Sequence, residues 1–323
     1  MDSLLSLINK VVSVEPRYDE EVCLAANRTG SCRECADACP HDAILVTSKV
    51  ELDSVDCSGC GLCVHACPSQ ALETNPRYER GRSVRCSRVK GSAQSVLCLG
   101  RLQASDLLRL LGGKERITLA HADCASCPIG SSAVLAALEE AREEALELAG
   151  LHGREARIEL LQTERFDLQD RGDVVSRREL LRGGWQGLKE RAGDMLAPLD
   201  PGEDEPDLPG EMQRRYRVIA ASHPAPEEPV PWRLPVVGDA CIMCPMCTNA
   251  CPTGAIERTF EATSDGVLML DPERCMGCDA CMSACPVRAI EMEEPVSWER
   301  LSAGRHETYR REPGKARSGG IAR

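Results

Sequence analysis

Four cysteines are spaced by two, two and three residues in Cys57-Ser-Gly-Cys60-Gly-Leu-Cys63-Val-His-Ala-Cys67-Pro68, and a proline follows the last one. The same C-x2-C-x2-C-x3-C-P run recurs over 241–252 and over 275–286. An incomplete copy, Cys32-x2-Cys35-x3-Cys39-Pro40, precedes the first run. Each copy continues with an alanine and an aliphatic residue shortly after its proline. The chain therefore contains an internal repeat whose copies are arranged in two pairs.

The spacing of these cysteines suits iron–sulfur clusters. Three thiolates two residues apart on a tight loop can reach three irons of one [4Fe-4S] cluster, whereas the fourth, carried past the loop before a proline, points to a neighbouring cluster. The paired runs resemble bacterial two-cluster ferredoxins in two places, about 25–82 and 236–294. Structural zinc is the alternative, since zinc also takes four cysteines, but its sites use two C-x2-C pairs instead of this run.

By this resemblance, crossed ligation divides the cysteines of the runs into four sets. They are Cys57, Cys60, Cys63 with Cys39; Cys32, Cys35, Cys67 with Cys23; Cys241, Cys244, Cys247 with Cys285; and Cys275, Cys278, Cys281 with Cys251. In the second set, Thr29 stands where the first cysteine of a complete run belongs, and Cys23 can serve if residues 24–31 fold back. The alternative is a three-cysteine [3Fe-4S] site with Cys23 as a buried thiol.

Each module is too short to bury much apolar surface, so its clusters would act as staples. The composition agrees, because the chain of 323 residues has 20 cysteines but only 2 Phe, 3 Trp and 4 Tyr. Between paired runs the sequence predicts β-hairpins over 43–53 and 257–271, the second with Asp265-Gly266 in its turn.

Residues 83–165 alternate between predicted strands and helices, which indicates a small parallel α/β unit. Its cysteines, Cys86, Cys98, Cys124 and Cys127, fall near strand ends, where open parallel sheets bind ligands. We expect them to hold a fifth centre, [4Fe-4S] or [2Fe-2S]. The region faintly resembles the small iron–sulfur subunit of hydrogenase–heterodisulfide reductase complexes and thioredoxin-like [2Fe-2S] ferredoxins. The alternatives are a Cys124/Cys127 dithiol at a helix N-terminus and ordinary buried cysteines.

The expected fold class is therefore α+β, with two ferredoxin-like 2[4Fe-4S] modules, over 1–82 and 236–295, flanking the α/β domain of 83–165. A capping box at Ser176-Arg-Arg-Glu179 predicts a short helical connector within 166–197. Residues 198–235 are rich in proline and predict an extended linker. Residues 296–323 are predicted to form a basic, solvated tail.

Several other function classes lack support in the sequence. Neither a dinucleotide fingerprint nor a P-loop is present, and no C-x-x-C-H attaches haem. A net charge of −12 disfavours nucleic acid as a partner. No apolar run approaches the roughly 18 residues of a membrane span, and no secretory signal opens the chain, so we expect the reducing cytoplasm.

These observations predict a non-catalytic electron-transfer subunit, a polyferredoxin relaying electrons through four [4Fe-4S] clusters and a fifth centre. By resemblance, its partner is the catalytic subunit of a larger oxidoreductase complex, either a molybdopterin enzyme such as formate dehydrogenase or a hydrogenase, together with a redox carrier. The alternative is a redox enzyme or sensor that acts on a disulfide through Cys124/Cys127, with the modules as electron supply. A cluster-assembly factor is a third interpretation, with no sequence feature of its own.

Overall fold

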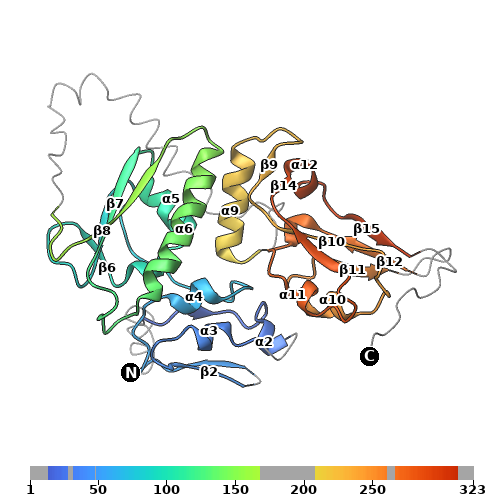
Figure 1. Ribbon diagram of the computed structural model, residues 1–323, viewed down its shortest axis with the longest axis horizontal. Coiled ribbons are helices and arrows are strands. Elements are labelled where there is room, and N and C mark those ends of the chain that lie inside the picture. Colours follow the sequence, from blue (N-terminus) through green and yellow to red (C-terminus); the bar gives the residue numbers. More distant parts are fainter. Residues whose placement is uncertain (1–13, 28–31, 48, 168–207, 260–265, 312–323) are drawn as a thin grey trace, which may run out of the picture.

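The computed structural model describes residues 14–27, 32–47, 49–167, 208–259 and 266–311, which form three parts in contact with one another (Figure 1). The helical connector expected within 166–197, apart from residues 166 and 167, lies outside these residues, as does the start of the expected linker. None of the helices within the described ranges is long and apolar enough to cross a membrane.

The N-terminal part is built from short elements between its cysteines. They are β1 (Arg17–Tyr18), α2 (Leu24–Asn27), α3 (Glu34–Asp37), β2 (Ile44–Val46), β3 (Val50–Leu52), α4 (Leu62–Ala66) and β4 (Leu72–Glu73). β2 and β3 form the predicted hairpin, and β1 pairs antiparallel with β4. Pro68 disfavours a helical backbone at the residue before it. α4 therefore ends before Cys67, whose backbone is extended with a ψ of 108°.

The middle part has a parallel sheet in the order β6-β5-β7-β8, which agrees with the predicted α/β unit. Its elements are β5 (Val84–Cys86), β6 (Gln94–Val96), η1 (Leu99–Arg101), α5 (Ala104–Leu111), β7 (Arg116–His121), α6 (Ala133–Gly150) and β8 (Arg157–Gln162). The helix predicted over 104–111 has these bounds, and Gly112 ends it in the left-handed conformation. Leucines of α5 and α6 pack on the sheet and form an apolar core.

The C-terminal part repeats the plan of the N-terminal one. It contains β10 (Leu234–Val237), α10 (Met246–Ala250), β11 (Ile256–Thr259), β12 (Val267–Leu270), η2 (Pro272–Arg274), α11 (Ala280–Ser283) and β13 (Ile290–Glu293). β11 and β12 are the two strands of the second predicted hairpin; most of its turn lies outside the described residues. β10 pairs antiparallel with β13, the strand after the last cysteine run. The two cysteine-rich ends thus fold alike.

Residues 208–235 differ from the extended linker that their prolines predicted. Gly210–Ala221 form the helix α9, which occupies the one long interval without proline, between Pro209 and Pro224. The apolar residues Met212 and Ile219 face inward at helical spacing and are buried. α9 lies between the middle and C-terminal parts (Figure 1).

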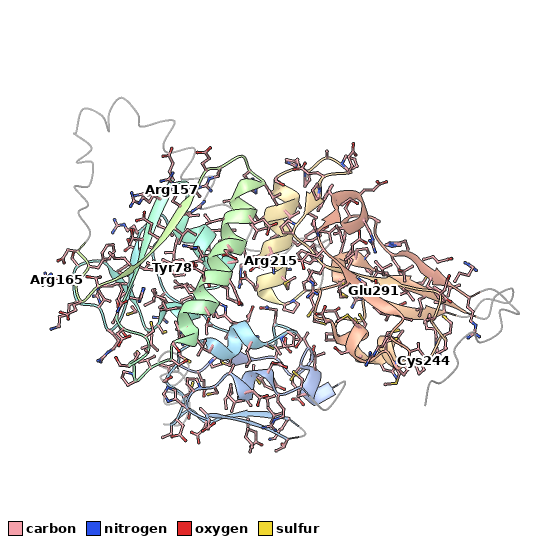
Figure 2. The ribbon with its side chains drawn as sticks, viewed as in Figure 1. Tyr78, Arg157, Arg165, Arg215, Cys244 and Glu291 are labelled. Atoms are coloured by element: carbon pink, nitrogen blue, oxygen red, sulfur yellow. The ribbon has the colours of Figure 1, made fainter. Side chains whose placement is uncertain are left out.

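Contacts on both sides hold α9 in place. The buried carboxylate of Glu211 accepts a hydrogen bond of 3.0 Å from the amide of Ser105 in the first turn of α5. Arg215, labelled in Figure 2, forms an ion pair of 2.6 Å with Glu144 of α6. On the other side, Tyr216 meets the ring of Trp232 edge-on, with centroids 6.1 Å apart. α9 therefore joins two parts of the molecule.

Residues 296–311 likewise differ from the solvated tail that their charge predicted. β14 (Val296–Ser297) pairs with β9 (Pro229–Val230), and α12 (Trp298–Leu301) follows directly. β15 (His306–Arg310) pairs with β12 and adds a third strand to the hairpin sheet. Val296 and Leu301 are fully buried, so this segment completes the core of the C-terminal part.

Candidate metal centres

A single turn conformation follows the last cysteine of every run. The residue three positions after that cysteine has a positive φ in all four copies: 52° at Asp42, 53° at Gln70, 66° at Gly254 and 50° at Arg288. Three of these residues are not glycine, and a non-glycine residue rarely adopts this conformation. The repeated turn is therefore a structural feature of the Cys-Pro motif itself.

This turn directs the amide of the next residue, an alanine, at the sulfur. The amides of Ala71, Ala255 and Ala289 donate hydrogen bonds of 3.2 Å to the Sγ atoms of Cys67, Cys251 and Cys285. Amide donors stabilise a negatively charged sulfur, and hydrogen bonds to sulfur are among the factors that set cluster potentials. The alanine of the repeat thus has a chemical role.

The predicted set of Cys57, Cys60, Cys63 and Cys39, named the Cys57 set, surrounds one cavity with about 390 Å³ of empty space. The thiol of Cys63 is buried, and the pKa of this group is raised by burial and by the charges of the other three cysteines. Arg101, which sequence reasoning did not single out, lines the same cavity. Cys39, the last cysteine of the incomplete run, thus lines the same cavity as the first three cysteines of the next run.

The predicted set of Cys32, Cys35, Cys67 and Cys23, named the Cys32 set, lines a second cavity of about 310 Å³. Cys23 directly precedes α2 and is buried against this cavity. Burial and the charges of Cys67, Cys32 and Cys23 raise the pKa of Cys35 to about 11. The structure thus brings Cys23 to the three cysteines that lacked a fourth.

The C-terminal cysteines separate in the same crossed way. The Cys275 set comprises Cys275, Cys278, Cys281 and Cys251. Burial raises the pKa of Cys281, and the charges of the other three cysteines raise it further. In the Cys241 set (Cys241, Cys244, Cys247 and Cys285), burial and the charges of Cys244 and Cys285 raise the pKa of Cys241. Burial and the charges of Cys241 and Cys244 raise the pKa of Cys247. In each set the charge of the last cysteine of the other run, Cys251 or Cys285, therefore acts on a thiol of the run.

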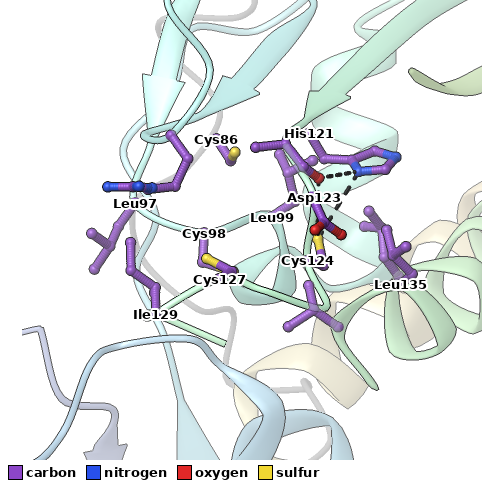
Figure 3. A pocket seen from close by; sticks show the side chains of 14 residues that line it. Cys86, Leu97, Cys98, Leu99, His121, Asp123, Cys124, Cys127, Ile129 and Leu135 are labelled. Carbon is purple, nitrogen blue, oxygen red and sulfur yellow. Dashed lines mark hydrogen bonds between the residues drawn. The ribbon is translucent and has the colours of Figure 1, made fainter. Parts of the chain in front are cut away.

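The remaining four cysteines, named the Cys86 set, face one cavity of about 370 Å³ in the middle part (Figure 3). Cys86 ends β5, Cys98 precedes η1, and Cys124 and Cys127 follow β7, so all lie at the carboxyl ends of strands. The backbone amide of Gly100 hydrogen-bonds the thiol of Cys98. The amide of Gly59 does the same for Cys57, again from two residues further along the chain. The loop at Cys98 therefore resembles the start of a cluster run.

Two features of the Cys86 set do not suit a dithiol that exchanges disulfides. Burial, together with the charges of Cys86 and Cys127, raises the pKa of Cys124 to about 11, whereas an exchanging thiol needs a lowered pKa. Cys127 also lies well ahead of α6, which begins at Ala133, so it is not at the N-terminus of that helix. Neither feature supports a Cys124/Cys127 dithiol at a helix N-terminus.

Each of the 20 cysteines lies within the described residues, and none of them forms a disulfide. Across the described ranges, no three Cys, His, Asp or Glu side chains stand close enough to bind one metal ion.

The Cys57 and Cys86 sets adjoin each other across the contact between the N-terminal and middle parts. Cys60 and Cys98 belong to one small apolar cluster with Val134. A Cβ atom at Gly130 would lie 3.5 Å from Cβ of Cys60 and 4.0 Å from Sγ of Cys98. Little more than the space of a methyl group therefore separates the two cysteines.

A second contact joins the N-terminal and C-terminal parts. Leu24 of α2 is buried against Ala250 of α10 and Ala280 of α11. Cys32 and Cys278, from two different sets, pack against this cluster. The Cys32 set and the Cys275 set are therefore neighbours, although more than 200 residues separate their runs.

Comparison with known families agrees with this geometry. Residues 30–71 and 240–289 match the model of a family described as 4Fe-4S dicluster domain. No curated protein and no solved structure matches the chain. The two matched regions are the two places where the sequence resembles two-cluster ferredoxins. The chain is thus a two-copy, ferredoxin-like iron–sulfur protein with a role in electron transfer.

Proposed function

We propose that the chain is the electron-transfer subunit of a larger oxidoreductase complex, with [4Fe-4S] clusters in the four ferredoxin-type sets and an iron–sulfur centre in the Cys86 set. The observation that carries the proposal is the grouping of the cysteines into five sets of four thiols, three of them around cavities of similar size. Bound clusters supply one-electron redox chemistry, with potentials that depend on hydrogen bonds to sulfur and on solvent exposure.

Contacts between neighbouring sets support a single route through the molecule. The Cys86 set adjoins the Cys57 set through Cys98 and Cys60. Within the N-terminal part, Cys63 and Cys35 are close enough for their charges to interact, and in the C-terminal part Cys281 and Cys247 are too. With the contact around Leu24, the order is the Cys86, Cys57, Cys32, Cys275 and Cys241 sets. The N-terminal module then occupies the middle of the route.

Exposed apolar side chains support a partner at the Cys241 end of this route. Ile242, Met246 and Val287 are 37–46% exposed and lie within two residues of cysteines of the Cys241 set, and Met282, 36% exposed, follows Cys281 of the Cys275 set. Figure 2 shows Cys244 on the side of this module turned away from the middle part. Contiguous exposed apolar patches mark interaction surfaces, and we propose that these four side chains form one. By the resemblance, we assign this end or the Cys86 end to a catalytic subunit of molybdopterin or hydrogenase type, and the other to a redox carrier.

The first test is the content of iron, zinc and acid-labile sulfide per chain in anaerobically purified protein. Four [4Fe-4S] clusters with a fifth centre correspond to about 18 irons for [2Fe-2S] and about 20 for [4Fe-4S] in the Cys86 set. A value of about 16 irons would remove the fifth centre from the proposal. Zinc in place of iron would overturn it altogether.

A paired variant locates the fifth centre. Cys98→Ser is expected to lower the iron of the Cys86 set alone, by about one to four atoms per chain. Ser95→Ala, on β6 close by in the sequence, is the matched control and should keep the wild-type iron content. Equal iron in wild type and Cys98→Ser would mean that these thiols hold no centre.

A further inference from the structure

Arg101 is a buried cation at the contact between the N-terminal and middle parts. Its residue is only 9% exposed, and it ends η1, three residues after Cys98. Nη1 donates hydrogen bonds of 2.6 Å to the carbonyl oxygen of Val14 and 3.2 Å to that of Gly59. These two bonds hold the guanidinium at the wall of the cavity of the Cys57 set.

The backbone around Arg101 leaves room for the guanidinium. Gly59 has a φ of +72°, and a Cβ atom there would lie 3.0 Å from Nη1 of Arg101. Gly61 and Gly100 meet so closely that a Cβ on Gly61 would collide with the carbonyl group of Gly100. Glycines on both loops therefore let the cation sit between the two parts.

The acidic groups that act on the guanidinium of Arg101 are cysteine thiols. Within the described part of the chain, no carboxylate forms an ion pair with it. The groups that act on its charge are Cys57, Cys60 and Cys63 of one set and Cys98 of the other. A buried cation without a counter-charge is costly, and iron-bound thiolates would supply that charge to Arg101 from both sides.

We propose that the positive charge of Arg101 tunes the midpoint potentials of two centres, one in the Cys57 set and one in the Cys86 set. The proposal rests on the proposed function, because both sets must hold clusters. Reduction adds one electron to a centre that its thiolates already make negative, and a nearby fixed cation stabilises the added charge. Arg101 therefore raises both midpoint potentials, and more strongly in the Cys57 set, where it lines the cavity. Arginine suits the site because it keeps its proton when buried.

The test is a redox titration of the full-length protein followed by EPR, with iron and sulfide measured on each sample. Arg101→Gln is expected to keep the iron content and to move the potentials of two centres to lower values, while the other potentials stay in place. Arg101→Lys keeps the charge and should stay close to wild type. Arg142→Gln is the control, because Arg142 is half-buried on α6 but its charge is already paired with Glu139 at 2.7 Å.

Three outcomes decide the matter. Unchanged potentials in fully loaded Arg101→Gln would overturn the role of Arg101 and leave the relay itself intact. If Arg101→Gln takes up less iron, Arg101→Lys decides alone, because wild-type potentials there support a charge effect and displaced potentials contradict it. Wild-type protein without iron in these two sets would instead contradict the proposed function.

Discussion

The fourth cysteine of each run depends on a turn of five residues. Cys67, Pro68 and the left-handed Gln70 bring the amide of Ala71 back to the Cys67 sulfur at 3.2 Å. The proline stops the preceding helix, and the positive φ reverses the chain, so the thiol points away from its own loop. The grouping of the fourth cysteine with the opposite run is therefore consistent with the backbone geometry of this turn.

The residue whose role is most open to a direct test is Cys23. Because it lies at the cavity of the Cys32 set, Cys23→Ser is expected to convert this set to three thiols and to cost about one iron per chain. Iron analysis and the EPR signal of an oxidised three-iron centre would measure the change. Thr29→Ala, at the position where the run lacks its first cysteine, is the control and should have no effect. A full iron content in Cys23→Ser would show that Cys23 is only a buried thiol.

At the scale of elements, the cores of the three parts differ in what fills them. The buried core of the N-terminal part includes Cys23, Cys35, Cys63 and Cys67 among few large apolar side chains. The core of the middle part is made of leucines, valines and isoleucines from α5, α6 and the sheet, with Cys86 at its edge. The first core therefore depends on its cysteines and the second on ordinary packing.

This difference predicts how the protein responds to loss of iron. After anaerobic removal of iron, the β2–β3 hairpin and α4 should lose protection against hydrogen exchange, because their core contains the ligands. β7, α5 and α6 should keep most of their protection, since Leu107, Leu119 and Ala145 are fully buried in the apolar core of the middle part. Hydrogen exchange read by mass spectrometry resolves these segments. Simultaneous loss of protection in all three parts would contradict the prediction.

At the scale of the whole molecule, two contacts bring cysteine sets of different parts next to each other. Cys60 and Cys98 meet across the first contact, and Leu24 fills the second between α10 and α11. α9 and its ion pair from Arg215 to Glu144 support the same arrangement from the side of the middle part. The order of the sets in space consequently differs from their order along the chain.

The contact at Leu24 can be tested without touching a cysteine. Leu24→Asp places a charge in a site that is 6% exposed, which should separate the N-terminal and C-terminal parts. We expect the iron content to be kept and the magnetic interaction between the Cys32-set and Cys275-set centres to be lost, as seen in EPR spectra of fully reduced protein. Leu45→Asp, on the exposed β2 strand at 57% exposure, is the control. An unchanged interaction in Leu24→Asp would refute the proposed order at this step.

The sequence predicted whatever depends on neighbours along the chain. The hairpins at 43–53 and 257–271 and the helix at 104–111 follow from turn residues and from apolar periodicity, and the structure has them. It also led to the repeated cysteine runs that the family comparison found independently. The sequence prediction of an extended linker was wrong for 208–235, and that of a solvated tail was wrong for 296–311. Proline content and charge describe only the average of a segment. A proline-free interval and a few buried side chains, such as Ile219 and Val296, decide whether it folds.

The tertiary structure alone decided which residues far apart in the chain meet. Cysteine spacing determines how one loop can hold a cluster, but nothing in it says that Cys60 lies beside Cys98 or that Leu24 lies between α10 and α11. Arg101 has no motif of its own and gains its place only when the Gly59 and Gly100 loops come together. Local spacing is a property of the chain, whereas contacts between parts depend on the shape that each part has after it folds.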